Sequence, residues 1–325
     1  MLLLSRSQIS KLMDFGDYVS VVEEAFRLHA EGCALEPALA HVDAEGGEFH
    51  IKAGGLKGDP PYFALKVNGG FFQNRVRLGL PNIQGLIVLS RADNGVPLAA
   101  MDSIEVTIQR TGAATAVAAK YLARPDSRVC TICGCGTQGR VQLRALRHAL
   151  QIERALAWSR QEERARAFAD EMSKELGIPV EPTTDLRAAA QQSDVVVTCT
   201  PARGAFFMKE YARPGMFIAA VGSDSPDKQE IDPGLLASSK IVADLRGQVT
   251  KVGDTHHAIE KGLMSGEAIH AELGEIITGT RPGRRSNDET FVFDSTGTAL
   301  QDVAAAGAVY ERAKAAKVGL EWNPV

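Results

Sequence analysis

Three closely spaced glycines carry the strongest chemical signal in this sequence. The stretch that begins at Arg128 reads RVCTICGCGTQG, so its glycines fit the pattern G-x-G-x-x-G between an expected strand and an expected helix. In that setting the first glycine permits a tight turn, the second lets a pyrophosphate approach the backbone, and the third lets helix and strand pack closely. The stretch therefore predicts a dinucleotide site, and a structural tight turn is the alternative. The candidate cofactor-binding residues here are Gly134, Gly136, Thr137, Gln138 and Gly139.

The second strand of such a unit should end in the residue that binds the adenosine ribose. An Asp or Glu at that point would hydrogen-bond the ribose hydroxyls and favour NAD. Here Ser159 is followed by Arg160, which could accept a 2′-phosphate. Both residues are candidates for cofactor binding, and they favour NADP(H). The alternative for Arg160 is a solvated residue at the start of a helix.

The five cysteines form neither a metal pattern nor a disulfide pattern. Cys130, Cys133 and Cys135 lie close together, but the sequence lacks a second ligand pair at a suitable spacing and the total is odd. We interpret them as small packing residues and expect no metal and a reducing cytoplasm. The N-terminal apolar run is too short for a signal peptide, and no run approaches the ~20 residues of a membrane span.

The charges and the length bound the class of protein. The 36 basic and 40 acidic residues give a formal net charge of −4, which argues against a nucleic-acid-binding surface. A chain of 325 residues corresponds to about two domains.

The elements that must position these residues follow two patterns. Apolar residues recur at helical spacing from Ser7 to about Glu31, whereas short apolar runs cut by Gly, Pro and Asn from about Ala34 to Ala100 indicate antiparallel strands. The tripeptide Asp93-Asn94-Gly95 predicts a turn between two of those strands. An Ala-rich helix is expected from Arg110 to Leu122.

From Ser127 onward, strands alternate with helices. The strand at 128–133 precedes a helix at 138–150, and the strand at 154–159 precedes a helix at 161–176. Later β-branched runs look buried on both faces, which is typical of a parallel sheet. The final element is a long Ala-rich helix over 299–316.

Four blocks of the sequence together resemble the ornithine cyclodeaminase/μ-crystallin family. They are KVN at 66–68, MDSIEVTIQRTGAA at 101–114, VGSDSPDKQE at 221–230 and FDSTGTALQDV at 293–303, and their order and spacing fit over nearly the whole chain. The resemblance implies hydride transfer between a nicotinamide and the α-carbon of an amino or imino acid. The family also includes alanine dehydrogenases and reductases of cyclic and acyclic imino acids.

The resemblance also implies the fold and the domains. We expect an α/β protein in which a Rossmann dinucleotide-binding domain, residues 123–297, is inserted in a discontinuous α+β domain. That second domain, residues 1–122 with 298–325, would bind the substrate and form a homodimer. The substrate would then lie between the domains, where ligand pockets are common.

Residue roles follow from the matched positions. Lys66 and Arg110 match the family's basic residues that hold the substrate α-carboxylate, and Arg can bind a carboxylate bidentately. Asp224 matches the acidic residue beside the nicotinamide, where it would protonate the imine nitrogen or stabilise an iminium. The candidate catalytic residues are therefore Asp224 and Lys66, with a turn aspartate and a surface lysine as the alternatives. Gln84 is a further candidate for substrate binding.

More cofactor contacts are expected along the same blocks. Thr111 and Gly112 begin the helix after Arg110 and would touch the cofactor phosphate, with core packing as the alternative. Ser295, Thr296 and Gly297 would contact the nicotinamide end, and Ser295 or Thr296 could instead cap the last helix. The remaining candidates are Thr200, Val221, Gly222 and Ser223.

The departures from the family are informative about the substrate. Cyclodeaminases carry an acid, followed shortly by Met-Pro, before the conserved lysine, but here the acid position holds His50 and Lys52 replaces the Met. A diamino acid would meet cations there. The family's upstream arginine is also missing, and Lys52 could replace its charge. Alternate strand residues share a face, so His50 and Lys52 can point together. With Lys66 and Arg110 they make four donors, more than one carboxylate needs, which suggests a dicarboxylate substrate.

The expected function is NAD(P)H-dependent reduction of an imino acid, with iminosuccinate to L-aspartate as the first choice. Ornithine cyclodeaminase, alanine dehydrogenase and pyrroline-2-carboxylate reductase activities are the alternatives, and a non-enzymatic μ-crystallin-like binding protein is a further one. NAD(H) and NADP(H) both remain open. Ser159 and Arg160 favour NADP(H), whereas the resemblance to the iminosuccinate reductases of the family favours NADH. The adjacent His256 and His257 are interpreted as structural residues at a helix start, and an approach of His256 to the nicotinamide or the substrate is the alternative.

Overall fold

The computed structural model describes residues 1–323 and divides the chain into two compact units. The first comprises Met1–Arg110 with Thr298–Val325, and the second comprises Thr111–Gly297. The boundary falls inside the long helix α4 (Ser103–Leu122), so this helix belongs in part to each unit. No helix among the described residues is both long and apolar enough to span a membrane.

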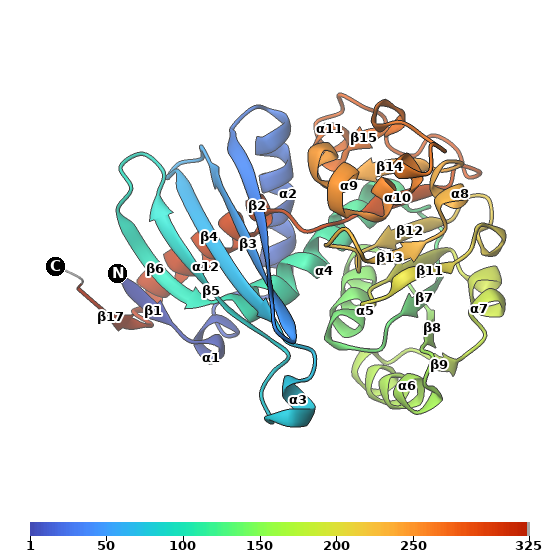
Figure 1. The fold of residues 1–325 in the computed structure, drawn as a ribbon, viewed down its shortest axis with the longest axis horizontal. Helices are drawn as coiled ribbons and strands as arrows, with labels where there is room; N and C mark the ends of the chain where they lie inside the picture. Colours follow the sequence, from blue (N-terminus) through green and yellow to red (C-terminus); the bar gives the residue numbers. More distant parts are fainter. Residues whose placement is uncertain (324–325) are drawn as a thin grey trace. The chain divides into compact units, whose positions relative to one another are not determined.

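The first unit contains a seven-stranded sheet in the order β17-β1-β6-β5-β4-β3-β2 (Figure 1). Strand β1 pairs in parallel with β6, and every other strand pair in this sheet is antiparallel. The sequence predicts antiparallel strands for residues 34–100. The predicted turn at Asp93-Asn94-Gly95 joins β5 to β6, and Gly95 has a φ of 76°. The strands are β1 (Leu2–Leu4), β2 (Ala34–Ala44), β3 (Gly47–Leu56), β4 (Tyr62–Gly70), β5 (Ile83–Arg91), β6 (Pro97–Asp102) and β17 (Leu320–Glu321).

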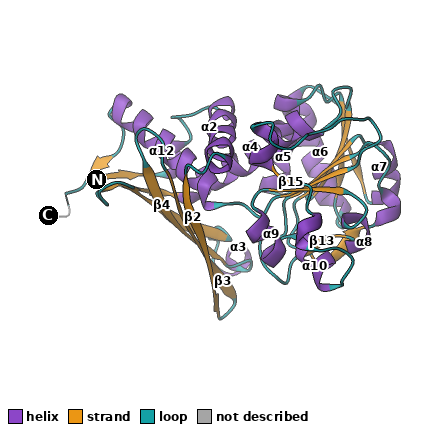
Figure 2. Cartoon of the chain, turned by 90° about the horizontal axis from the view of Figure 1, so that it is seen from above, coloured by secondary structure: helices purple, strands orange, loops and turns teal. Residues whose placement is uncertain are grey.

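Two helices cover one face of this sheet. Helix α12 (Ala299–Ala316) packs on β3 and β4, and α2 (Phe15–Ala30) packs beside it on the same face (Figure 2). Small side chains along α12 let it lie close to the strands: a Cβ at Gly54 of β3 would lie 3.0 Å from the Cβ of Ala299. The other helices of the unit are short, namely α1 (Arg6–Ile9) and α3 (Asn74–Arg77).

The opposite face of the same sheet carries exposed apolar side chains. Val42, Phe49, Leu86 and Val88 are 51%, 38%, 56% and 37% exposed. The cross-strand register places Phe49 opposite Gly69, and Leu86 opposite Val67, away from the helix-covered face. Contiguous exposed apolar surface of this kind is typical of a protein–protein interface.

The second unit contains an eight-stranded sheet in the order β15-β14-β16-β12-β10-β7-β8-β9, with every pair parallel. Strand order reverses at β7, which has β8 on one side and β10 on the other, and this is the switch point of a doubly wound Rossmann sheet. The strands are β7 (Val129–Cys133), β8 (Arg154–Trp158), β9 (Val180–Thr183), β10 (Val195–Thr198), β12 (Phe217–Ala220), β14 (Lys240–Ala243), β15 (Ala271–Glu272) and β16 (Phe291–Asp294).

Helices connect these strands, and a small parallel pair lies apart from the main sheet. That pair is β11 (Arg203–Phe207) with β13 (Gln229–Ile231). The central strands β7, β10, β12 and β16 are almost wholly buried, as expected for strands inside a parallel sheet. The helices are α5 (Thr137–Ala149), α6 (Glu162–Leu176), α7 (Leu186–Gln192), α8 (Pro233–Leu236), α9 (Arg246–Val252), α10 (Asp254–Glu260), α11 (Leu273–Ile277), and the 3-10 turns η1 (Lys209–Tyr211) and η2 (Gly266–Ala268).

The fold class predicted from the sequence, an α/β protein with a Rossmann unit and a second α+β unit, is confirmed. One predicted helix start is wrong. The helix expected at Arg110 begins at Ser103, because the side chain of Asp102 accepts hydrogen bonds from the backbone N–H groups of Ile104 and Glu105. Thr111 and Gly112 therefore lie in the middle of α4, where their backbone N–H groups serve the helix.

Candidate functional site

Three charged side chains of the first unit meet in a buried cluster. The Lys66 Nζ on β4 lies 2.6 Å from Oδ2 of Asp302 on α12, and the Arg110 Nε on α4 lies 3.1 Å from Oδ1 of the same carboxylate. Arg110 also donates to Oε1 of Gln301 at 2.8 Å. All these side chains are nearly inaccessible to solvent. One carboxylate thus fixes the two cations that the sequence predicts to hold a substrate carboxylate.

Lys52 adds a third cation to this cluster. It stands opposite Lys66 in the β3–β4 register, so the two side chains share the helix-covered face, and it is 5% exposed. Burial lowers the pKa of Lys66 to about 7, while Asp302 acts against this shift and Arg110 and Lys52 reinforce it. Burial also opposes ionisation of Asp302, yet the attraction of Lys66 and Arg110 holds its pKa below the usual range.

Two other predicted substrate residues are placed differently. His50 shares the face of Lys52, but its Nε2 lies 3.0 Å from Oε1 of Glu48, so it already has a carboxylate partner. Gln84 pairs with Gly69 in the β4–β5 register, whereas Ile87 pairs with Lys66. The side chain of Gln84 therefore lies on the exposed apolar face, on the opposite side of the sheet from the Lys66 cluster.

The phosphate loop of the second unit has the geometry that its glycines predict. Gly134 follows β7 with a φ of 122°, a conformation that favours glycine. A Cβ at Gly139 would lie 2.0 Å from the carbonyl oxygen of Gly134, so the helix can approach the strand only without a side chain there. Gly136 caps α5, and a Cβ there would meet no atom within 4 Å. Thr137 and Gln138 form the first turn of this helix.

An arginine that the sequence analysis does not single out fixes the same loop. Arg140 Nη1 donates to the carbonyl oxygens of Cys135 and Gly136, both at 3.0 Å, and the guanidinium also pairs with Glu171. These bonds fix the loop at the start of α5, where the first backbone N–H groups of the helix have no partner within the helix itself. The loop therefore fits a pyrophosphate group, which a helix N-terminus of this length attracts.

The end of β8 lacks a carboxylate, as predicted. The Ser159 hydroxyl accepts a hydrogen bond from the backbone N–H of Gln161 at 3.2 Å, just before α6. Arg160 is exposed at the same turn. The two residues thus lie where a dinucleotide's adenosine ribose is bound in a doubly wound fold.

A buried glutamate supports the loops that follow β10 and β12. Glu230 accepts from the backbone N–H and the hydroxyl of Thr200, at 2.6 and 2.7 Å, and from the backbone N–H of Gly222 at 2.9 Å. A Cβ on Gly222 would lie 2.4 Å from Glu230, so this position requires glycine. Ser223 donates to the Lys228 carbonyl oxygen at 2.7 Å. Thr200 and Ser223 therefore hold the loops in place, and Val221 directly follows β12.

Asp224 lies at the end of this loop and is partly exposed. Its Oδ1 accepts a hydrogen bond from Lys228 Nζ at 2.6 Å, and the aspartate side chain is 38% exposed while that of the lysine is 11% exposed. The largely buried lysine orients a carboxylate that is still partly exposed to solvent. This is a suitable arrangement for a group that exchanges a proton with a bound substrate.

The segment after β16 is held by a second buried carboxylate. Asp244 accepts from the Thr296 hydroxyl at 3.0 Å and from the Gly297 backbone N–H at 2.7 Å. Gly297 has a φ of 75°. Neither Ser295 nor Thr296 caps the last helix, because Thr298 is the N-cap residue of α12. The Ser295 hydroxyl is buried and has no hydrogen-bond partner within residues 1–323.

Two further buried carboxyls lie at the same end of the sheet. Asp254 accepts through Oδ1 from the backbone N–H groups of Glu230 and Ile231, and Asp294 accepts through Oδ2 from Thr255. Their other oxygens lack hydrogen-bond partners among the described residues. Burial raises the pKa of Asp254 to about 7, and Glu230 adds to this shift; burial and the neighbouring Asp254 raise the pKa of Asp294 too.

The histidine pair at 256 and 257 lies in the first turn of α10. His256 Nδ1 hydrogen-bonds to the carbonyl oxygen of Gly253, and His257 Nε2 lies 2.9 Å from the Lys228 carbonyl oxygen. Each ring therefore has a backbone carbonyl partner, three residues away for His256 and 29 residues away for His257.

Three of these residues are missed by reasoning from the sequence. Asp302, Glu230 and Asp244 hold the predicted functional groups in place, and the first two lie inside the blocks that carry the family resemblance. A buried acid that pairs with a cation or a backbone N–H group cannot be recognised without the three-dimensional structure, because its partner is distant in the sequence.

Comparison with known proteins places the chain in a family. The model of the ornithine cyclodeaminase/mu-crystallin family matches residues 1–317. The chain therefore belongs to that family.

Characterised relatives share nearly the whole chain. The alanine dehydrogenase of Archaeoglobus fulgidus is 38% identical over 319 residues, covering 98% of this chain and 97% of that protein. The iminosuccinate reductase of Paracoccus denitrificans is 34% identical over 319 residues, with 97% of each protein covered. Relatives of similar sequence identity are thus named for different substrates.

Solved structures show the same fold with cofactor. An archaeal alanine dehydrogenase dimer with bound NAD has a TM-score of 0.95, 38% identity, and coverage of 100% of this chain and 99% of that one. The Thermococcus litoralis Δ1-pyrroline-2-carboxylate reductase with NADH and L-proline has a TM-score of 0.94 and 36% identity, covering 99% and 100%. The P. denitrificans iminosuccinate reductase with NAD⁺ has a TM-score of 0.91 and 31% identity, covering 99% of each. These neighbours bind NAD or NADH.

Proposed function

We propose that this protein is an NAD(P)H-dependent imino-acid reductase whose preferred reaction is the reduction of iminosuccinate to L-aspartate. The observation that carries the proposal is the buried group of Lys52, Lys66 and Arg110 around a single carboxylate, Asp302. Lys52 lies beside Lys66 on the same face of the sheet, so three cationic side chains gather near that carboxylate. A dicarboxylate neutralises two charges, whereas a monocarboxylate neutralises one.

His50 plays a smaller part in this proposal than the sequence suggests. Since Glu48 already occupies its Nε2, His50 adds no uncompensated charge to the cluster. The clamp for the substrate then consists of Lys66 and Arg110 for the α-carboxylate and Lys52 for the distal carboxylate. His50 borders the distal position from the same strand face.

In the reaction, Lys66, Arg110 and Lys52 hold the two carboxylates of the substrate before its imine carbon is reduced. The bound nicotinamide supplies the hydride that forms the new C–H bond. Asp224 gives the proton that completes the N–H bond, so the C=N double bond becomes CH–NH with one hydride and one proton added. Lys228 keeps the Asp224 carboxyl oriented. A substrate fixed through its carboxylates needs little further motion to react, which lowers the entropic part of the barrier.

Cofactor binding is assigned to three glycine-containing segments. The loop at Gly134, Gly136 and Gly139 would hold the pyrophosphate, and the buried-acid-supported segments at 221–223 and 295–297 would approach the nicotinamide. Arg160 would bind a 2′-phosphate, which favours NADPH although the solved neighbours carry NAD or NADH.

The first unit would also form a homodimer in this proposal. The exposed apolar face with Phe49, Leu86 and Val88 supports a dimer interface. A neighbour of known structure is described as a dimer. The mass in solution, measured by light scattering, tests this: we expect twice 34.8 kDa, and a monomer at micromolar concentration would contradict it.

Alanine dehydrogenase activity is the second candidate. It is favoured by the 38% identity with the A. fulgidus enzyme, which exceeds the 34% with the iminosuccinate reductase. Cyclodeamination of ornithine is less well supported, because a distal amino group would meet Lys52.

Rates with competing imines test the proposal. Oxaloacetate with ammonia, pyruvate with ammonia, and Δ1-pyrroline-2-carboxylate are each supplied to the purified protein with NADH or NADPH. We expect the highest kcat/KM with oxaloacetate plus ammonia, and L-aspartate as the product by chromatography. Turnover of pyruvate plus ammonia or of the cyclic imine without oxidation in the oxaloacetate mixture would overturn the assignment.

A further inference from the structure

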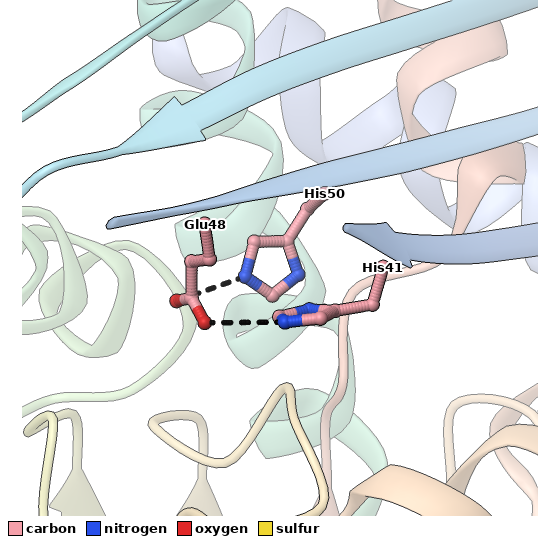
Figure 3. A group of neighbouring side chains, drawn as sticks. All are labelled: His41, Glu48 and His50. Atoms are coloured by element: carbon pink, nitrogen blue, oxygen red, sulfur yellow. Dashed lines mark ion pairs between the residues drawn. The ribbon is translucent and has the colours of Figure 1, made fainter. Parts of the chain in front are cut away.

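Two histidines and a glutamate converge at the end of the β2–β3 hairpin (Figure 3). His41 on β2 stands directly opposite His50 on β3, and Glu48 precedes His50 by two residues, so all three side chains lie on one face. The ring centroids of the two histidines are 4.8 Å apart at 83°. This group, His41, Glu48 and His50, is called the hairpin cluster below.

The carboxylate of Glu48 pairs with both imidazoles (Figure 3). His50 Nε2 is 3.0 Å from Oε1, and His41 Nε2 is 3.6 Å from Oε2. The potential ligand atoms of the three side chains all lie within 4.8 Å of one another. A tetrahedral Zn²⁺ with bonds of 2.0–2.1 Å places its ligands about 3.4 Å apart, so the cluster needs only small side-chain movements to reach that geometry.

We propose that the hairpin cluster binds a divalent transition-metal ion of the Zn²⁺ class, with His41, His50 and Glu48 as its three protein ligands. Two imidazoles and one carboxylate are a common ligand set for Zn²⁺, with water in the fourth position. Hard cations such as Mg²⁺ prefer oxygen ligands and are excluded by the two imidazoles. Asp43, whose Oδ1 lies 3.1 Å from His41 Nε2, is near enough to replace the water.

The side chains are arranged as a binding site requires. The side chains of Glu48 and His50 are 14% and 12% exposed, and that of His41 is 32% exposed, so the ligands are partly desolvated while an ion can still enter. A paired antiparallel register fixes the Cβ positions of all three, since His41 pairs with His50 and Asp43 pairs with Glu48. The rigid pairing keeps the ligands close without the metal, which reduces the ordering that binding requires.

A second group, His256, His257 and Glu260, is the internal competitor for the same ion. Its geometry is poorer, because His256 Nε2 lies 4.0 Å from Glu260, whose side chain is 70% exposed. His256 Nδ1 and His257 Nε2 are already engaged by backbone carbonyl groups. The two groups share no residue, so variants separate them.

Cobalt titration of the untagged, chelator-treated protein tests the proposal. Co²⁺ in a tetrahedral site gives visible d–d absorption, and Zn²⁺ then displaces it in a competition that reports affinity. We expect one strong site per chain in the wild type. His41→Ala should weaken Co²⁺ and Zn²⁺ binding by more than about tenfold, since even outer-shell changes typically cost that much. Glu48→Gln should also weaken it.

Matched variants show whether the hairpin cluster is the site. Glu260→Gln and His148→Ala, the latter at a histidine in α5 outside both groups, should bind Co²⁺ like the wild type. Saturating Zn²⁺ should raise the Tm of the wild type and of Glu260→Gln, but not of His41→Ala, because an ion that binds only the folded state stabilises it. Absent binding in the wild type, unchanged binding in a folded His41→Ala, or loss confined to Glu260→Gln would overturn the proposal.

Discussion

Lys66 Nζ and Asp302 Oδ2 lie 2.6 Å apart in a buried part of the first unit, although the residues are 236 positions apart in the sequence. The same carboxylate contacts Arg110. The pair thus joins strand β4 to the last helix and connects two of the four blocks that carry the family resemblance. Asp302 acts as a positioning residue for the cations that would bind the substrate.

Asp302→Asn should impair both stability and substrate binding. Breaking one partner of a buried pair costs about 3–5 kcal/mol, because the remaining charges are left uncompensated. Removing the anion also lowers the pKa of Lys66 further below its present value of about 7, since Asp302 is the group that raises it. We expect the decline of kcat/KM with rising pH to start at lower pH than in the wild type. Asp170→Asn, at an exposed position of α6, is the control. A pH profile identical to that of the wild type would contradict this role.

Asp224→Asn should lower kcat much more than it raises KM. General acid–base assistance typically contributes about 10²–10⁴-fold, and the amide cannot give the proton. Lys228→Met removes the hydrogen bond to Asp224 but keeps the carboxyl, so its loss should be smaller. Stopped-flow measurement of cofactor oxidation separates the hydride step from product release. An equal loss in both variants would show that the pair is structural.

Arg160→Ala should change cofactor preference without abolishing activity. A charged hydrogen bond to a phosphate contributes about 1.5–3 kcal/mol, so kcat/KM with NADPH should fall about 10–100-fold. The value with NADH should stay close to that of the wild type, because NADH lacks the 2′-phosphate. Arg164→Ala, one turn along α6, is the control. Equal losses with both cofactors would exclude a role for Arg160 in phosphate recognition.

Asp254→Asn should alter the pH dependence of folding stability. Burial raises the pKa of Asp254 to about 7, so the folded protein binds more protons than the unfolded chain between about pH 4 and 7. Wild-type stability from this group is therefore present at low pH and is lost as pH rises through about 7, at up to about 1.4 kcal/mol per pH unit. The asparagine variant should lack this part of the slope. Urea unfolding at pH 5, 6, 7 and 8 measures it, and parallel curves for the two proteins would contradict it.

Much of the second unit can be predicted from the sequence. The glycine spacing at 134–139, the buried β-branched runs and the alternation with helices lead to a parallel sheet with its phosphate loop, because each is a local pattern. Strand β16 is not predicted from the sequence. Its four residues overlap the block at 293–303, which we use for the family resemblance and not for secondary structure. The start of α4 is missed because Asp102, a residue with poor helix propensity, caps it.

The candidate site can be predicted only in part, because several of its members act through distant partners. Lys52, Lys66 and Arg110 are found from charge in apolar surroundings and from the resemblance. The face of Gln84 and the partner of His50 depend on cross-strand register, which a single sequence does not specify. Asp302 lies within one of the motifs, but the sequence does not indicate that its carboxylate contacts Lys66 and Arg110, because those residues are distant along the chain.

The most direct test of the central claim is the effect of Lys52→Met on substrate choice. The variant removes the charge assigned to the distal carboxylate and leaves Lys66, Arg110 and Asp302 in place. We measure kcat/KM for oxaloacetate plus ammonia and for pyruvate plus ammonia in both proteins. The account predicts that the ratio of the two values falls at least about tenfold in favour of pyruvate, the loss expected for one charged hydrogen bond. Equal losses for both substrates would contradict the dicarboxylate clamp.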